Sequence, residues 1–134
     1  MQPKSSLLIA LGWRVMDFFC CKFMIHYRRT ENIMNNSPIT IIARIKAKPG
    51  MEERMRKDLL SLLTPTRAES GCIKFDLLIN TNDKTTFILC ENWQDRAALD
   101  AHFQQQYVKQ VLQAYQETLL EPIKIMSLQK IESV

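Results

Sequence analysis

The fold is decided by the stretch Phe87-Ile88-Leu89-Cys90-Glu91-Asn92-Trp93, which alternates like a half-buried strand but carries a charge on its apolar face. The two-residue period of a strand sets four of these side chains on one face: Phe87, Leu89, Glu91 and Trp93. A carboxylate among large apolar groups needs a polar partner, because an unpaired buried charge is costly. The stretch therefore predicts a strand that lines the interior and an opposing element that supplies the partner.

The segment that follows this strand is predicted to be a helix, and it carries His102, the one histidine beyond residue 38. Asp95 is a suitable N-cap, and Leu99, His102 and Phe103 fall on one stripe of the helix. The imidazole should therefore face the same interior as Glu91, and two polar groups in one apolar hollow suggest a pocket. The other interpretation is that His102 is a core histidine, satisfied by Glu91 or by a backbone carbonyl.

Hydrophobic periodicity predicts the remaining elements. Residues 39–47 alternate as a strand that ends at Lys48-Pro49-Gly50, and residues 51–63 form an amphipathic helix. Pro65 predicts a bend or a restart of this helix near Thr64. A second strand at 72–80 is expected to place Ile73 on the same face as Phe75. A turn at 81–84, the strand at 85–93, a helix from 95 to 119 with a break near 104–106, and a last strand at 123–131 complete the order.

This order, strand-helix-strand-strand-helix-strand, predicts an α+β fold of the ferredoxin-like βαββαβ type, an antiparallel sheet with its helices on one face. The uncovered face of such a sheet would carry Ile42, Ile88, Met126 and Leu128, and it is too apolar to leave in water. Two such sheets paired across a two-fold axis would cover each other. The sequence therefore predicts a homodimer, a dimeric α+β barrel.

Composition is that of an ordinary soluble chain with one compact domain, which we place at residues 39–134. The chain has 134 residues, of which 46% are hydrophobic and 24% charged, and its formal charge is +4. Residues 1–38 carry five Lys or Arg against two acids, whereas the remainder carries thirteen against twelve. The domain is thus nearly neutral, and its scattered basic residues do not support nucleic acid binding.

Residues 1–38 are expected to be an N-terminal extension that is disordered or is not part of the native protein, with translation starting at Met34 or Met24. The apolar run at residues 7–25 is interrupted by Arg14, Asp17 and Lys22, so it predicts no transmembrane helix. No small-residue cleavage site follows that would mark a signal peptide. An amphipathic segment on a membrane surface remains the alternative, without stable membrane insertion.

The cysteines favour neither a metal site nor a disulfide framework. Cys20 and Cys21 are adjacent, Cys72 and Cys90 are isolated, and no Cys-x-x-Cys pair occurs. The two in predicted strands are expected to behave as small buried hydrophobic residues, which indicates a reducing, cytoplasmic location. No cofactor is predicted.

Six short motifs, in their order and spacing, carry a family resemblance: Ala43-Arg44, Lys48-Pro49-Gly50, Pro65-Thr66-Arg67-Ala68-Glu69, Gly71-Cys72, Glu91-Asn92-Trp93 and Asp95-Arg96-Ala97-Ala98-Leu99-Asp100-Ala101-His102. Over about residues 39–130 the chain resembles the antibiotic biosynthesis monooxygenase domain family, which includes quinol monooxygenases. The resemblance implies a homodimer with a pocket between sheet and helices in each subunit. It also implies oxidation of electron-rich aromatic substrates by dioxygen, without metal or flavin.

The resemblance further implies roles for individual residues. By position, Glu91, Trp93 and His102 line the pocket, with His102 as the catalytic base and Glu91 as the group that orients its ring and stabilises its cation. Substrate contacts are expected from five side chains: Trp93, Tyr107, Phe103, Arg44 and Arg67. A salt bridge across the dimer remains the alternative for Arg44, a solvated position for Arg67, and simple core packing for Trp93.

Two positions depart from the family's pattern. Many members carry a small-Pro-His-aromatic run shortly after the helix histidine, whereas this chain has Gln104-Gln105-Gln106-Tyr107-Val108. Tyr107 cannot act as an imidazole base at neutral pH, so a mechanism that needs two histidines does not fit. Haem-degrading relatives use an Asn where this chain has Ala43, which disfavours haem degradation.

The expected function is therefore a cofactor-independent monooxygenase that oxidises a quinol or polyphenolic small molecule with dioxygen. One alternative is an isomerase of a small phosphorylated carbonyl compound, which a basic pocket mouth at Arg67 or Arg44 would favour. The other is a non-catalytic binder of aromatic metabolites, because the fold by itself does not imply chemistry.

Overall fold

The computed structural model describes residues 37–131. The expectations for the N-terminal extension fall almost entirely on residues 1–36, which lie outside the described residues. Across residues 37–131, none of the helices combines the length and the apolar character that spanning a membrane requires.

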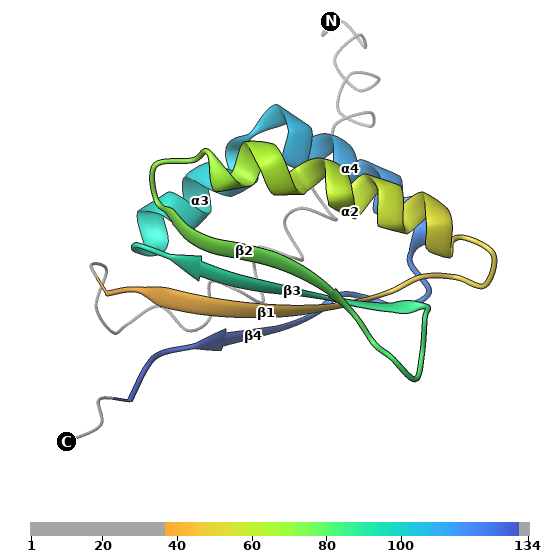
Figure 1. The fold of residues 1–134 in the computed structure, drawn as a ribbon. Helices are drawn as coiled ribbons and strands as arrows, with labels where there is room; N and C mark the ends of the chain where they lie inside the picture. The colour runs from red at the N-terminus through yellow and green to blue at the C-terminus, as the bar shows by residue number, and fades with distance from the viewer. Residues whose placement is uncertain (1–36, 132–134) are drawn as a thin grey trace, which may run out of the picture. The chain divides into compact units, whose positions relative to one another are not determined.

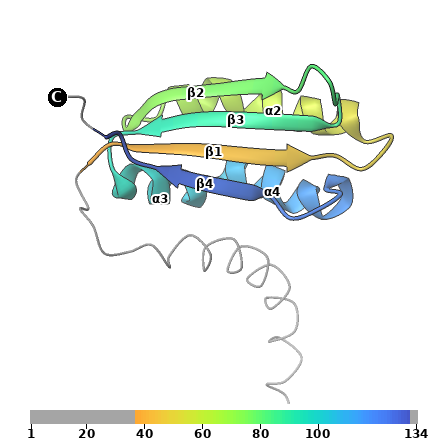
Figure 2. The same cartoon turned by 90° about the horizontal axis from the view of Figure 1, so that it is seen from below.

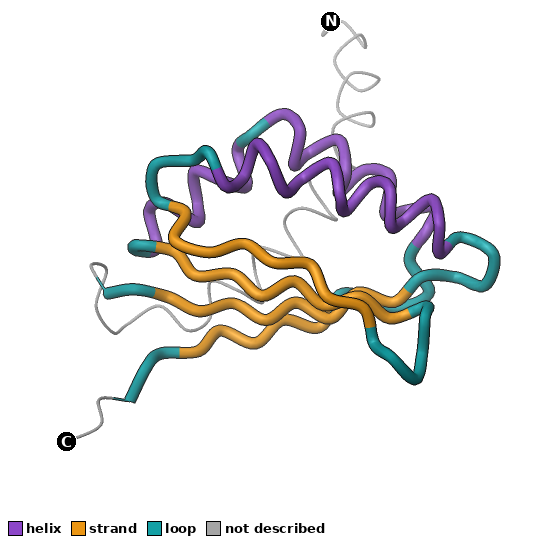
Figure 3. Tube along the Cα trace, in the orientation of Figure 1, coloured by secondary structure: helices purple, strands orange, loops and turns teal. Residues whose placement is uncertain are grey.

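Four strands and three helices follow one another in the predicted order, with the second predicted helix divided in two (Figures 1 and 3). The division falls at Gln105, within the predicted break. In chain order the elements are β1 (Ile39–Lys46), α2 (Glu52–Arg67), β2 (Cys72–Ile79), β3 (Thr86–Trp93), α3 (Arg96–Gln104), α4 (Gln106–Thr118) and β4 (Lys124–Leu128). The ferredoxin-like α+β prediction is confirmed.

The sheet has the strand order β2-β3-β1-β4, and every neighbouring pair is antiparallel. All three helices cover one face, and the view from the opposite side shows the strands with the helices behind them (Figure 2). Strands β2 and β4 are the two edges, so the sheet of one chain is open and is not a closed barrel. A barrel needs a second subunit, and the dimer stays a prediction.

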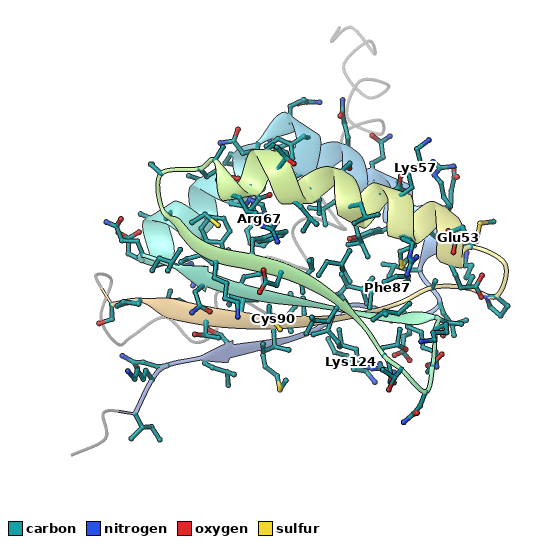
Figure 4. All side chains as sticks on the ribbon, viewed as in Figure 1. Glu53, Lys57, Arg67, Phe87, Cys90 and Lys124 are labelled. Atoms are coloured by element: carbon teal, nitrogen blue, oxygen red, sulfur yellow. The ribbon has the colours of Figure 1, made fainter. Side chains whose placement is uncertain are left out.

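The core lies between the sheet and the helices. The predicted alternation of β1 is confirmed, since Ile41, Ala43 and Ile45 are buried on the helix side. Figure 4 shows Phe87 of β3 on that side, between the sheet and α2. Burial of each such large side chain contributes roughly 1.5–3 kcal/mol, which fixes the faces of the strands and thereby the direction in which Glu91 points.

Helix α2 does not restart near Thr64, which Pro65 had predicted as one outcome, but continues through Pro65 to Arg67. Pro65 lies in the last turn, where its ring and its missing N–H disturb one hydrogen bond near the helix end rather than in the middle of the helix. The backbone N–H groups of Ala68 and Glu69 still close the helix end, on the carbonyls of Pro65 and Thr66 respectively. The chain therefore leaves α2 one turn later than predicted, just before Glu69.

Strand β2 differs from its predicted pattern at Ile73. The pairing with β3 shifts between Cys72 and Lys74, because Cys72 opposes Trp93 whereas Lys74 already opposes Asn92. Such a bulge inserts one extra residue and interrupts the alternation. Ile73 is consequently 61% exposed, and the prediction that it shares the inner face with Phe75 is wrong.

The sheet face away from the helices, which we call the outer face, carries a contiguous group of apolar side chains. Ile42 of β1 lies between Met126 of β4 and Cys90 of β3, with which it pairs. Two residues along β3, Ile88 pairs with Leu78 of β2. Met126 is 55% exposed, and Lys124 projects on this side of the sheet (Figure 4). The prediction of an apolar uncovered face is thus confirmed.

Two cysteines fall within the described residues, and both are thiols without a disulfide. Cys72 at the start of β2 and Cys90 on β3 are half-buried. In the single chain neither thiol is buried as expected, because Cys90 points to the outer face and Cys72 precedes the bulge.

Candidate functional site

The inner face of β3 holds a carboxyl group against an indole. Glu91 is 5% exposed and Trp93 is fully buried. Because residues two apart on a strand share a face, Trp93 Nε1 can donate a hydrogen bond of 2.9 Å to Glu91 Oε2. Burial, with a smaller contribution from the charge of Glu69, raises the pKa of Glu91 to about 7 against the lowering effect of the indole donor.

His102 reaches the same interior from α3. The side chain of Asp95 accepts a hydrogen bond of 2.8 Å from the backbone N–H of Ala98, so this helix begins with the predicted N-cap. The buried imidazole of His102 lies against the indole of Trp93, with 4.7 Å between ring centroids, and against Phe75, at 5.7 Å. Imidazole, indole and carboxyl therefore share one interior.

The hydrogen-bond partner of the imidazole is Glu69, from the loop between α2 and β2. His102 Nδ1 lies 2.7 Å from Glu69 Oε1. The hydroxyl of Tyr107, at the start of α4, donates to the same oxygen and lies 3.3 Å from Thr66 Oγ1. We call these four residues, Glu69, His102, Tyr107 and Thr66, the Glu69 cluster. It joins α2, the following loop, α3 and α4.

The sequence suggested that Glu91 orients the ring of His102. In the structure the carboxylate bonded to the ring is Glu69. The reason is geometric: the side chain of Glu91 is held by the indole on its own strand, whereas the end of α2 brings Glu69 to the Nδ1 edge of the ring. The sequence signal for Glu69 was its position. A carboxylate just after the C-terminus of a helix faces the negative end of the helix dipole, and such a placement needs a compensating donor.

The electrostatics favour a neutral imidazole with its proton on Nδ1. Burial lowers the pKa of His102 below its ordinary value, while the hydrogen bond and charge of Glu69 oppose that shift. An ionised carboxylate only accepts, so Nδ1–H donates to Glu69 and Nε2 keeps the lone pair. Burial and Glu69 also raise the pKa of Tyr107 to about 12, so its hydroxyl stays a donor at neutral pH.

A surface hollow of about 410 Å³ borders the Glu69 cluster. Its walls are the loop after α2, the residues before α3 and the outer side of α3: Glu69, Ser70, Gly71, Gln94, Asp95, Ala97, Ala98, Ala101 and Gln105. The loop approaches the helix closely, because a Cβ on Gly71 would lie 2.2 Å from the Cβ of Ala98. Glycine at this position therefore permits the close approach of the loop to α3.

The two predicted arginine contacts lie elsewhere. Arg44 is on the opposite face of the sheet from His102 and forms a salt bridge with Glu121 of the same chain. Arg67, labelled at the end of α2 in Figure 4, donates a hydrogen bond of 2.9 Å to the carbonyl of Phe75 and one of 3.2 Å to the carboxylate of Asp76. The structure thus holds Arg67 against the edge strand β2 and does not bring Arg44 into the site.

The other predicted site residues do come together around the imidazole. Phe103 lies 5.5 Å and Tyr107 6.3 Å from His102 between ring centroids. Sequence reasoning missed Glu69 and Thr66, although both lie in the motif at residues 65–69. Across residues 37–131, no group of three or more His, Cys, Asp or Glu side chains is arranged to hold a metal ion.

Comparison with known proteins identifies the domain. The family model described as antibiotic biosynthesis monooxygenase matches residues 38–114. The uncharacterized protein sll1783 of Synechocystis is 31% identical over 90 residues, which are 67% of this chain and 61% of sll1783. The protein named "Putative monooxygenase Rv0793" of Mycobacterium tuberculosis is 39% identical over 66 residues, 49% of this chain and 64% of Rv0793. The chain thus spans less than two thirds of these two curated relatives.

Solved structures agree with the sequence comparison. The crystal structure of PA3566 from Pseudomonas aeruginosa is similar with a TM-score of 0.69 and 32% identity, over 75% of this chain and 100% of PA3566. The structure of Rv0793 gives a TM-score of 0.69 and 30% identity, over 72% of this chain and 98% of Rv0793. The family model covers more than half of the chain and the fold is the same, so the chain belongs to the antibiotic biosynthesis monooxygenase family.

Proposed function

We propose that the protein is a homodimeric, cofactor-independent monooxygenase that oxidises a quinol or polyphenolic small molecule with dioxygen. Family membership and the name of Rv0793 support a monooxygenase role. The observation that carries the proposal is the 2.7 Å hydrogen bond between Glu69 and Nδ1 of His102. It aligns a neutral imidazole within a cluster of aromatic rings, which is how a general base for an acidic hydroxyl is built.

In the proposed reaction, Nε2 of His102 takes the proton of a substrate hydroxyl, and the resulting anion passes one electron to dioxygen. The superoxide and the substrate radical then combine to form a carbon–oxygen bond. The proton held by His102 returns to the peroxide, whose O–O bond breaks as water leaves with the hydrogen of the attacked carbon. A quinol and O₂ thereby give a hydroxyquinone and one water, so that one oxygen atom enters the product.

The surrounding residues have distinct roles in this proposal. Trp93 and Phe103, whose rings pack beside His102, would stack against a flat substrate that reaches the imidazole. Glu69 stabilises the imidazolium that forms during proton transfer. Glu91 holds the indole of Trp93 in place through its hydrogen bond. Water is kept from the anion by the burial of these groups.

The isomerase alternative depended on a basic pocket mouth at Arg67 or Arg44, and neither arginine supplies one. A small phosphorylated substrate needs cationic side chains at the pocket, but Arg44 pairs with Glu121 and Arg67 with Asp76. The hollow beside the cluster is instead lined by the carboxylates of Glu69 and Asp95. The binder alternative shares every contact with the monooxygenase, so activity must separate the two.

Oxygen uptake with a panel of quinols and dihydroxynaphthalenes, measured in the presence of a metal chelator, tests the proposal. His102→Ala should lower kcat/KM roughly 10²- to 10⁴-fold, since that is the usual contribution of a general base. Arg54→Ala, which breaks an exposed ion pair with Asp58 on α2, should leave the rate unchanged. Uptake that His102→Ala does not alter would exclude this base, and tight quinol binding without any uptake would favour the binder.

A further inference from the structure

We infer that the hollow beside Glu69 is where the substrate first docks, before it moves on to Nε2 of His102, and that Oε2 of Glu69 recognises a hydroxyl hydrogen of a ligand that carries no negative charge. The inference rests on the proposed function and narrows its substrate class to neutral hydroxylated aromatics. It assigns recognition to a carboxylate rather than to an arginine. The ligand is thereby selected before it reaches the imidazole.

The hydrogen bonds of Glu69 are unevenly divided between its two oxygens. Oε1 receives both donors of the cluster, Nδ1 of His102 and the hydroxyl of Tyr107. Within residues 37–131, Oε2 takes part in no hydrogen bond or ion pair. A carboxylate offers about four acceptor positions, so the second oxygen retains its full capacity for an incoming donor.

Glu69 is also the member of the buried pair that a ligand in the hollow contacts directly. Its side chain is 14% exposed and lines the hollow, whereas the side chain of His102 is 4% exposed and does not. A hydroxyl that enters the hollow therefore meets Glu69 first. One hydrogen bond, 2.7 Å long, then separates that contact from the imidazole.

The walls of the hollow suit an aromatic ring. Three alanines of α3, Ala97, Ala98 and Ala101, give a surface of methyl groups, and Gly71 faces them without a side chain. A volume of about 410 Å³ falls within the range of small-molecule sites. Gln94 and Gln105 add amide groups that offer a donor and an acceptor to further hydroxyls of the ligand.

The charge of the walls sets the preference between ligands. The lining contains two acids, Glu69 and Asp95, and no Lys, Arg or His. An anionic ligand would bring a like charge next to these carboxylates, whereas a phenol or quinol presents an O–H donor. A carboxylated or phosphorylated aromatic should therefore bind more weakly than its neutral parent.

Anaerobic titration calorimetry tests the inference, because binding without oxygen does not depend on turnover. The probes are 1,4-dihydroxynaphthalene, its dimethyl ether and its 2-carboxylate. The wild-type protein should bind the diol at least tenfold more tightly than either of the other two. Equal affinity for diol and dimethyl ether would overturn the role of Glu69 as acceptor.

Two variants and one matched control locate the site. Glu69→Gln should reduce the preference for the diol over the carboxylate, since it removes one of the two acids of the lining and keeps the shape. Ala101→Phe should weaken diol binding at least tenfold by filling the hollow, and it should fold normally because Ala101 is exposed on α3. Gln113→Phe places the same aromatic ring at an exposed position of α4 outside the lining and should bind like wild type.

The outcomes separate this inference from the proposed function. Wild-type affinity in Ala101→Phe, with its melting temperature unchanged, would refute docking in the hollow even if oxygen uptake is normal. An unaltered diol-to-carboxylate ratio in Glu69→Gln would refute recognition by this carboxylate. Selective binding of the diol without oxygen uptake would support the site and reject only the monooxygenase.

Discussion

Glu69 is a carboxylate placed where a helix makes it unfavourable, one residue past the C-cap of α2. Two donors on one oxygen offset that cost, and both come from other elements, His102 from α3 and Tyr107 from α4. A single side chain thus links the end of α2 to both later helices. Its charge acts on the imidazole directly, which makes the protonation of His102 a measure of this contact.

Glu69→Gln should lower the pKa of His102 further below its ordinary value. Burial alone would then set that pKa, because the hydrogen bond and the charge of Glu69 are the two effects that raise it. Nitrogen NMR titration of the imidazole measures the pKa and the tautomer together. Tyr107→Phe should move the pKa the opposite way, since it removes the second donor to Glu69 Oε1 and leaves more charge for the imidazolium. Shifts of the same sign in both variants would contradict this account.

Glu91 should make the protein less stable as the pH rises. Its pKa is about 7 in the folded state, above the ordinary value of 4.5, so the folded protein binds more protons than the unfolded chain between these values. The free energy of unfolding therefore falls from pH 4.5 to about 7 and then levels off, by on the order of 3 kcal/mol.

Denaturant titrations of Glu91→Gln at each pH isolate this effect. The amide keeps an oxygen for the indole N–H of Trp93 but does not titrate. Subtracting the variant from wild type also removes the contribution of His102, whose lowered pKa acts in the opposite direction with pH. A difference that stays constant from pH 4.5 to 7 would show that Glu91 ionises normally.

At the scale of elements, the sequence predicted most of what periodicity controls. The strands, the N-cap at Asp95 and the break at Gln105 follow from alternation, capping and polar content, all of which are local. Two local rules failed for reasons that lie outside the segment. The bulge at Ile73 depends on pairing with β3. Helix α2 continues past Pro65 because this proline lies in the last turn and not in the middle of the helix.

The candidate site was predictable only in part. The convergence of Glu91, Trp93 and His102 follows from strand and helix periods. The pairing of His102 with Glu69 instead depends on the length of α2 and on the close approach at Gly71, which periodicity does not describe. Arg67 was predicted to contact a ligand, but it donates a hydrogen bond to the carbonyl of Phe75 instead. This contact forms only in the folded chain, so the local sequence does not reveal it.

Gly71→Ala should separate the loop after α2 from α3. The added Cβ would lie 2.2 Å from the Cβ of Ala98, closer than any packing allows, so the loop or the helix must move. Overpacking of this kind costs roughly 1–3 kcal/mol, measured as the free energy of unfolding. The His102–Glu69 hydrogen bond should weaken with it, seen as a lower imidazole pKa.

Ala98→Gly is the matched second change, since it removes the clashing methyl group. By itself it should destabilise α3 by about 1 kcal/mol, the cost of glycine in a helix. Combined with Gly71→Ala it should recover part of the lost stability, giving a favourable coupling in the double-mutant cycle. Additive losses would mean that these two residues do not meet.

At the scale of the whole molecule, the two faces of the sheet have different roles. The helix side buries the Glu69 cluster, whereas the outer face exposes apolar side chains of all four strands. Leu78, Met126 and Leu128 are all exposed there. Leu78 pairs with Ile88 and Met126 with Ile42, so apolar side chains lie on neighbouring rows of this face. A soluble monomer rarely leaves such a surface in water, and a second sheet related by two-fold symmetry would cover it.

Met126→Glu should therefore convert a dimer into a monomer. Met126 lies opposite Ile42 in the register of β4 and β1, so the new carboxylate would be buried against an apolar sheet if the two subunits paired through this face. Sedimentation velocity of wild type should give the mass of two chains, and of the variant that of one. Leu60→Glu is the control, because Leu60 is 51% exposed on α2, on the helix layer rather than the outer face, and its charge should leave the dimer intact. A monomeric wild type, or a variant that still sediments as a dimer, would rule out pairing through the outer face.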